Sequence, residues 1–229
     1  MKKYCHEILG ILLAICIIIG DVLYIVYGAL WRKGVTSALF FLLGTSFFIP
    51  LVLQKKKKIL FPSFMLMGLF LTMIADIILN IHFISGAILF AVGHIFYMIS
   101  YRMLHNWHWR DFVVIGVLAI PAVLWLTLSS MFYYGGILME VVVVVYAIII
   151  SFMVGKAISN WMDGLLKEKK SKPLELVIVL GSLLFFFSDC MLLLNVFADF
   201  PKVVDVLCLA TYYPAQILLA TSIYIYKNS

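Results

Sequence analysis

Residues 8–30 read ILGILLAICIIIGDVLYIVYGAL, a run of 23 residues in which Asp21 is the one charged side chain. A helix of about 20 apolar residues is long enough to cross the hydrocarbon core of a bilayer. The run follows Met1-Lys2-Lys3 and so resembles the start of a signal peptide, but it continues without a small-residue cleavage site. We therefore expect it to be retained as a first transmembrane helix.

The composition of the whole chain agrees with a membrane protein. Of the 229 residues, 65% are hydrophobic and 12% are charged, whereas soluble domains average about 45–50% and about 25%. A chain of this length has too little interior to bury such an excess of apolar side chains. We expect residues 1–229 to form a single integral membrane domain.

Seven further apolar runs follow the first one, separated by short polar or basic breaks. We predict an all-α, polytopic transmembrane bundle of about eight helices, near 8–30, 34–53, 59–80, 83–101, 112–129, 133–156, 174–197 and 202–226. The longest break, 157–173, is basic and partly amphipathic. We interpret it as a segment at the membrane surface, with Trp161 at headgroup depth.

Basic residues are distributed unevenly between the two sides of this bundle. The N-terminus, the second, fourth and sixth connections and the C-terminal tail hold 14 of the 17 Lys and Arg residues, and the other side holds Arg32, Lys33 and Lys202. The positive-inside rule then places both termini in the cytoplasm. The net charge of +6 is therefore interpreted as a topology signal, and no nucleic-acid partner is expected.

Four acidic side chains fall inside predicted spans: Asp21, Asp76, Glu140 and Asp189. A carboxylate at the bilayer centre costs about 2.5–3.5 kcal/mol on insertion scales, so each one is a candidate functional residue. All four fall in the predicted extracytoplasmic half of the membrane. The competing interpretation is a buried carboxyl group that only pins helices together.

Other polar residues accompany these acids. Asn80 and Asn195 follow Asp76 and Asp189 along their helices, so the hairpins 59–101 and 174–226 form a weak internal repeat. His94 is predicted near mid-membrane, and Tyr212 and Tyr213 at comparable depth. A histidine satisfied by a carbonyl or hydroxyl group, and tyrosines that pack in a core, are the simpler explanations.

Two classes of cofactor protein do not fit the sequence. A retinal protein needs a lysine within a span, and we expect every lysine here to lie in a connection, a tail or at the edge of a span. The four cysteines show no CxxC spacing, and His94 with two aspartates lacks the ligand spacing of a zinc site. We predict no metal and no cofactor.

Two carboxyl groups from different helices, in a pocket of low dielectric constant, are suited to acid–base chemistry. One can stay protonated and act as a general acid while its partner stays ionised. Reactions that pass through an oxocarbenium ion, such as glycoside hydrolysis, are well served by such a pair.

Four segments resemble the YhhN family, whose members include lysoplasmalogenases: ADIIL (75–79), GHIFY (93–97), GSLLFFFSD (181–189) and LATYYPAQ (209–216). One departure is Ala75, where glycine is expected before the first aspartate, and this change is conservative. The resemblance implies hydrolysis of the vinyl ether bond of a lysoplasmalogen, which gives a fatty aldehyde and glycerophosphoethanolamine or glycerophosphocholine. It also implies that Asp76 and Asp189 are catalytic.

Vinyl ethers hydrolyse by protonation at carbon, so our hypothesis is that one aspartate donates the proton while the other stabilises the cation and activates water. The substrate is expected to be a lysophospholipid that enters sideways from the outer leaflet of a bacterial cell membrane. The remaining polar groups are predicted to bind substrate or water: His94, Asn80, Asn195, Tyr212, Tyr213, Glu140 and Asp21.

Other functions remain open at this stage. A proton-coupled or lipid transporter also uses intramembrane acids and repeats. Against it, the repeat is parallel, and the spans that carry Asp76 and Asp189 lack a Gly or Pro break at the acid. A hydrolase of another lysolipid and a non-catalytic lipid-binding protein complete the alternatives.

Overall fold

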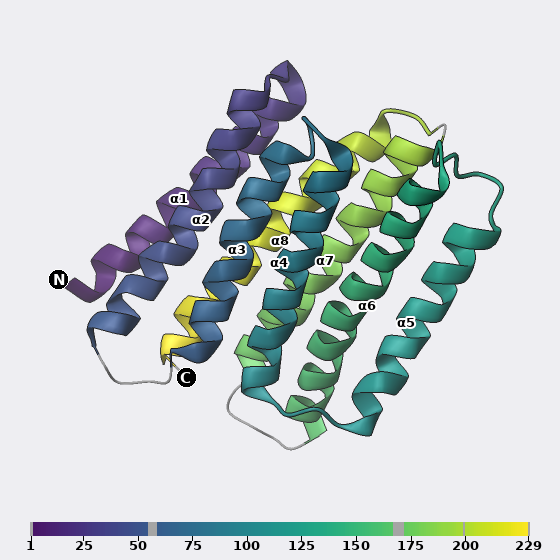
Figure 1. Cartoon of the computed structure of the whole chain (residues 1–229). Helices are drawn as coiled ribbons and strands as arrows, with labels where there is room; N and C mark the ends of the chain where they lie inside the picture. The colour runs from purple at the N-terminus through teal and green to yellow at the C-terminus, as the bar shows by residue number, and fades with distance from the viewer. Residues whose placement is uncertain (1, 55–58, 167–171, 199, 229) are drawn as a thin grey trace.

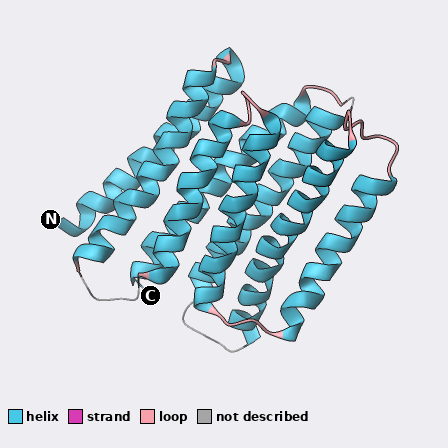
Figure 2. Ribbon diagram, viewed as in Figure 1, coloured by secondary structure: helices cyan, strands magenta, loops and turns pink. Residues whose placement is uncertain are grey.

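The computed structural model describes residues 2–54, 59–166, 172–198 and 200–228. Over these residues the chain forms eight helices and no strand (Figure 1, Figure 2). All eight are long and apolar enough to cross a bilayer, which confirms the predicted fold class. The helices are α1 (Lys2–Tyr27), α2 (Leu30–Leu53), α3 (Leu60–Ile78), α4 (Phe83–Leu104), α5 (Trp109–Leu128), α6 (Ile137–Leu166), α7 (Lys172–Phe197) and α8 (Val203–Asn228).

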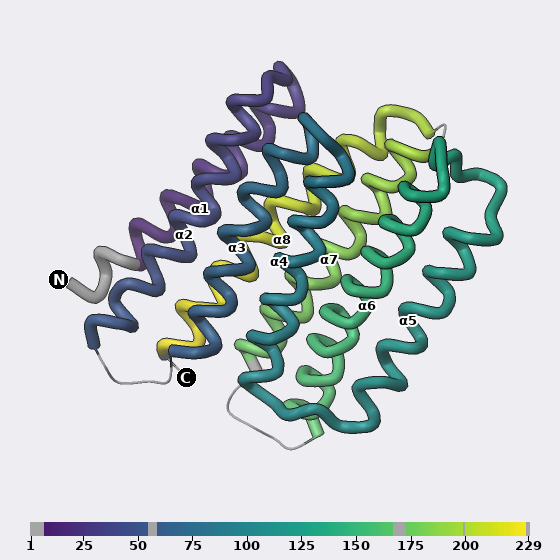
Figure 3. The backbone as a smooth tube through the Cα atoms, in the orientation of Figure 1, coloured from purple at the N-terminus to yellow at the C-terminus, as the bar shows by residue number. Residues whose placement is uncertain are grey.

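Consecutive helices run in opposite directions, as the backbone tube shows (Figure 3). The α1–α2, α3–α4, α5–α6 and α7–α8 connections therefore lie together at one end of the bundle, called the hairpin end below (Figure 1). Both termini and the other connections lie at the opposite end, called the terminal end (Figure 1).

Helix α8 occupies the centre of the bundle, where it packs against α1, α2, α3 and α7. The side chains of Phe40, Leu69, Tyr97, Phe185 and Tyr213 are completely buried there. Helix α5 lies at one edge (Figure 1), and among the described residues it packs against α6 alone. This peripheral position leaves one side of α5 without a helical neighbour.

The α3–α4 hairpin is held close by a glycine. A Cβ atom on Gly86 would lie 2.4 Å from the Cα atom of Leu79, so only glycine lets α4 approach the end of α3 at this distance. His82 precedes α4, and its Nδ1 atom accepts a hydrogen bond from the backbone N–H of Ser85 at 3.3 Å. The hairpin brings Asp76 of α3 and His94 of α4 into the same bundle.

The structure places the first break between helices earlier in the sequence than predicted. The chain turns at Gly28 and Ala29, whose φ angles are 64° and 76°, and α2 begins at Leu30. Lys33 is therefore a buried residue in the first turn of α2, and the prediction that it lies in a connection is wrong. Hydropathy missed it because a lysine lowers a hydropathy average whether or not it has an internal partner.

The predicted break at 157–173 is also wrong over its first ten residues. Helix α6 continues to Leu166, Asn160 and Asp163 are buried, and Trp161 packs against the core. The helix continues because its polar side chains find partners inside the protein, such as the Tyr101 carbonyl 2.9 Å from Asn160 Nδ2. Residues 167–171 of that segment lie outside the described part of the chain.

Candidate functional site

Asp189 of α7 forms a connected group with two other side chains, Tyr146 of α6 and His94 of α4. The Tyr146 hydroxyl donates a hydrogen bond to Asp189 Oδ2 at 2.6 Å and lies 2.7 Å from His94 Nε2. His94 Nε2 is itself 3.6 Å from Asp189 Oδ2. The other imidazole nitrogen of His94, Nδ1, is buried and has no hydrogen-bond partner among the described residues.

This group lies beside an apolar cavity of about 390 Å³. Tyr146 and Asp189 form part of its wall, and the rest is almost entirely hydrocarbon. Its size is in the range of pockets that bind small molecules. The cavity is lined by Val117, Leu118, Pro121, Ala122, Trp125 and Leu126 of α5, by Tyr146, Ala147 and Ile150 of α6, and by Phe186, Asp189, Cys190 and Leu193 of α7.

Access to this cavity follows from the position of α5. Helices α5 and α7 both line the cavity, yet among the described residues α5 packs against α6 only. The side of the cavity between α5 and α7 is therefore not closed by a direct helix contact in the described part of the chain.

Asp76 of α3 lies in a second polar group, nearer the hairpin end. Lys33 Nζ is 2.9 Å from Asp76 Oδ1, and the hydroxyl groups of Ser37 and Tyr213 both donate to Asp76 Oδ2, the latter at 3.2 Å. The four side chains are buried. Both oxygens of the Asp76 carboxyl group therefore have partners inside the protein, one an ammonium group and the other two hydroxyl donors.

Asp21 of α1 belongs to the edge of this second group. Its side chain is 4% exposed, it interacts electrostatically with Asp76, and its Oδ1 atom has no hydrogen-bond partner. Asp21 thus lies close enough to Asp76 for the two carboxyl groups to interact.

Asp76 and Asp189 occupy separate groups in this structure. Among the described residues, no hydrogen bond or ion pair joins them. Aromatic rings connect the two groups: the Tyr212 ring packs edge-on against the rings of Tyr213 and Phe185 at 5.0 and 5.2 Å. Phe185 in turn contacts the His94 ring at 4.7 Å. The two carboxyl groups are therefore linked through aromatic packing and not through a direct contact.

The remaining predicted residues lie at different places. Tyr212 is buried between the two groups, and its hydroxyl has no partner. Asn80 is exposed and donates to the backbone carbonyl of Asp76 at 2.7 Å. Asn195 is exposed and donates to Asp205 Oδ1 at 3.3 Å, and half-buried Glu140 in the first turn of α6 interacts with Tyr134. The structure does not bring Asn195 and Glu140 into contact with either aspartate group.

Comparison with known families now identifies the chain, because a model of the YhhN family matches residues 33–223. The chain belongs to the YhhN family. The matched region starts at Lys33 and includes both aspartate groups apart from Asp21, so the YhhN region carries the cavity and almost all of the polar interior. No solved structure matches the chain.

Sequence reasoning did not identify three members of the two polar groups: Lys33, Ser37 and Tyr146. Lys33 and Ser37 stand one turn apart on α2, so a Lys-x-x-x-Ser pattern at the start of a span was an available signal. Tyr146 had no such signal, because it stands alone among the apolar residues of α6.

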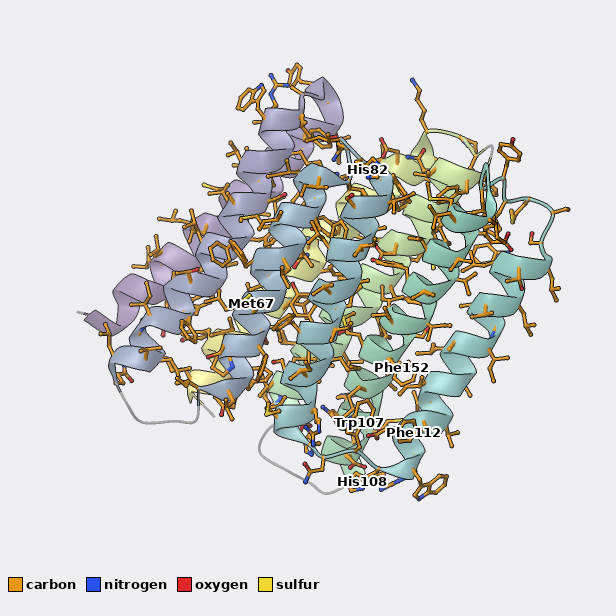
Figure 4. The ribbon with its side chains drawn as sticks, viewed as in Figure 1. Met67, His82, Trp107, His108, Phe112 and Phe152 are labelled. Carbon is orange, nitrogen blue, oxygen red and sulfur yellow. The ribbon has the colours of Figure 1, made fainter. Side chains whose placement is uncertain are left out.

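A further buried ion pair lies at the terminal end, where Trp107, His108 and Phe112 cluster (Figure 4). Lys156 Nζ lies 2.6 Å from Asp111 Oδ2 and 5.0 Å from the centre of the Trp107 ring. Ser159 also donates to Asp111. This group joins the start of α5 to α6, so we interpret it as structural.

Proposed function

We propose that this protein is a membrane-embedded hydrolase that cleaves the vinyl ether bond of a lysoplasmalogen, giving a fatty aldehyde and glycerophosphoethanolamine or glycerophosphocholine. The observation that carries the proposal is the position of Asp189, with Tyr146 and His94 behind it, in the wall of an otherwise apolar cavity. Membership of the YhhN family supports the same reaction class.

The proposed reaction needs one proton and one water. Protonated Asp189 donates its proton to the β-carbon of the vinyl ether, which leaves an oxocarbenium ion and an Asp189 carboxylate. Water attacks the cation and gives its proton to that carboxylate. The resulting hemiacetal breaks its carbon–oxygen bond to release the aldehyde and the glycerol hydroxyl group. Asp189 ends protonated, so it acts first as an acid and then as a base, as carboxyl groups do in glycosidases.

Tyr146 and His94 are the proposed positioning residues of this site. The Tyr146 hydroxyl fixes the orientation of the Asp189 carboxyl group, and His94 fixes the orientation of Tyr146. Because these groups are buried, they need little reorganisation when charge develops on the substrate.

Asp76 is proposed as the second catalytic carboxyl group, with a different task. It interacts electrostatically with Tyr212, the ring that lies between the two groups, and its proposed task is to support the positive charge that develops on the substrate beside Asp189. This division keeps the two different tasks that the sequence hypothesis gave to the two aspartates. Tyr213 supports Asp76 through its hydrogen bond.

The substrate of this reaction is proposed to come from the bilayer. The cavity accepts the single hydrocarbon chain between α5 and α7, with the headgroup toward the hairpin end. We place that end outside the cytoplasm and both termini inside, on the basis of the distribution of Lys and Arg. A bacterial cell membrane is the proposed location.

The test is aldehyde release from lysoplasmenylethanolamine by the purified protein in detergent, with Asp189→Asn and Asp76→Asn beside the wild type. Glu7→Gln is the matched control, because Glu7 lies on α1 at the terminal end and its Oε1 atom accepts a hydrogen bond from Tyr224 at 2.7 Å. We expect release by the wild type and by Glu7→Gln, and a loss of about 10²–10⁴-fold in Asp189→Asn.

Other outcomes favour the other functions. If the folded wild type releases no aldehyde but hydrolyses a different lysolipid, the proposed site stands and the proposed substrate is replaced by that lysolipid. Flux of a lysolipid across sealed vesicles without any product favours a transporter. Full activity in folded Asp189→Asn would contradict the proposed chemistry.

A further inference from the structure

A second apolar groove, outside the proposed hydrolase site, lies between α1 and α2. It has a volume of about 220 Å³, and its walls include Cys16, Ile19 and Leu23 of α1 and Val35 and Leu39 of α2. Helix α1 is the least enclosed part of the bundle together with α5, with 17% of its span buried. The groove therefore opens toward lipid.

An arginine stands at one end of this groove. Arg32 lines it, and its guanidinium group lies 5.2 Å and 5.3 Å from the ring centres of Tyr27 and Trp31. It also donates to the Gly28 carbonyl at 3.3 Å. These contacts hold the guanidinium group in place while several of its N–H donors stay available for a ligand.

The charge of Arg32 is not neutralised within the part of the protein that the structure describes. The neighbouring Lys33 is paired with Asp76, whereas no ion pair with a carboxylate is formed by Arg32 in the described residues. Arg32 is also one of the three basic residues on the side of the bundle that the positive-inside rule predicts to be poor in them. We infer that the guanidinium group of Arg32 binds an anionic partner.

The shape of the groove matches the way a phospholipid stands in a bilayer. Tyr27 and Trp31 are each 67% exposed at the hairpin end, and exposed Tyr and Trp side chains mark the headgroup level of a membrane. Leu39, at the inner end, lies about 10 Å farther along the α2 axis than Arg32. The groove thus runs from headgroup depth into the hydrocarbon, with its cation at the headgroup end.

We propose that this groove binds an anionic phospholipid of the surrounding leaflet, with the phosphate on Arg32 and one acyl chain between α1 and α2. The planar guanidinium group suits a phosphate because it can donate two parallel hydrogen bonds. A bound lipid here fills the space between α1 and α2, and α2 is the helix whose Lys33 and Ser37 hold Asp76. The lipid therefore supports the side of the bundle that positions Asp76.

The experiment measures lipid retained on the purified full-length protein, by native mass spectrometry, after exposure to phosphatidylglycerol or phosphatidylcholine in detergent. We expect the wild type to retain more phosphatidylglycerol, by about tenfold, and Arg32→Gln to lose that preference. Lys202→Gln is the matched control, because Lys202 is an exposed cation at the same end of the bundle, and it should keep the preference.

A second variant tests the groove without changing any charge. Ile19 lines the groove and is 53% exposed, so Ile19→Trp fills the groove while pointing toward lipid. Ile19→Trp should lower retention of phosphatidylglycerol by as much as Arg32→Gln does. If Arg32→Gln does not fold, the result for Ile19→Trp alone tests the proposal. Equal retention of the two lipids by the wild type, or unchanged preference in both variants, overturns the proposal. Both measurements detect bound lipid and not turnover, so the test of this lipid site is independent of the hydrolase activity.

Discussion

Lys33 Nζ lies 2.9 Å from Asp76 Oδ1, and both side chains are less than a tenth exposed. A buried ion pair of this kind costs much desolvation, and removing one partner leaves the other as an uncompensated charge. We predict that Lys33→Met lowers the free energy of unfolding by about 3–5 kcal/mol, while the double variant Lys33→Met/Asp76→Leu recovers most of this loss. Unfolding in detergent, followed by circular dichroism, measures both effects.

The control for this prediction is the pair formed by Arg110 and Asp163. The Arg110 side chain is 47% exposed and its nitrogen lies 3.4 Å from the carboxylate oxygen. Arg110→Met should therefore cost less than about 1 kcal/mol. If Lys33→Met is no more destabilising than Arg110→Met, the Lys33–Asp76 pair does not carry the stability that its burial implies.

The eight helices could be predicted from the sequence because a bilayer demands long, apolar and internally hydrogen-bonded segments. The site could be predicted only in part. The sequence singles out Asp76 and Asp189 because acids are rare in spans, but it assigns Lys33 to a connection. Its partner is 43 residues away in the sequence, and a one-dimensional hydropathy pattern contains no information about such a contact.

Tyr146 illustrates a different limit of sequence reasoning. A tyrosine in a transmembrane helix is ordinary, and its role depends on which residues of α4 and α7 face it. The sequence predicts His94 near mid-membrane and Asp189 in the extracytoplasmic half, but it does not show that one phenol bridges them. The separation of Asp76 from Asp189 by aromatic rings likewise depends on side-chain packing between helices.

We predict that Tyr146→Phe lowers kcat for aldehyde release by about a hundredfold, the lower end of what a positioned acid–base group contributes. The variant keeps the ring but removes the hydroxyl that donates to Asp189 at 2.6 Å. Steady-state kinetics on lysoplasmenylethanolamine measure kcat and KM separately. Tyr134→Phe, which removes a hydroxyl bonded to the Leu126 carbonyl, is the matched control. Equal kinetics for both variants would remove Tyr146 from the mechanism.

The cavity beside Asp189 is predicted to hold the hydrocarbon chain of the substrate. Ala122 lines this cavity from α5, so Ala122→Phe should occupy part of its volume and raise KM by about tenfold with little effect on kcat, because chain binding and not proton transfer is changed. Leu124→Phe is the control on the same helix, since Leu124 is 49% exposed and outside the cavity wall. If KM is the same for Ala122→Phe and Leu124→Phe, the hydrocarbon chain of the substrate binds elsewhere.

The close approach of α3 and α4 gives the last prediction. A Cβ atom on Gly86 would lie 2.4 Å from Leu79 Cα and 2.5 Å from its backbone nitrogen, and backbone atoms cannot move aside as a flexible side chain can. Gly86→Ala should therefore push the two helices apart and lower the free energy of unfolding by about 1–3 kcal/mol.

The same change should also lower aldehyde release, because Asp76 and His94 stand on the two helices that move. Gly136→Ala is the control, since a Cβ atom there meets nothing within 4 Å, and its effect should stay within about 0.5 kcal/mol. Thermal unfolding and kinetics on both variants decide the outcome. If Gly86→Ala is as stable and as active as Gly136→Ala, the tight α3–α4 contact is not what sets the geometry of the two polar groups.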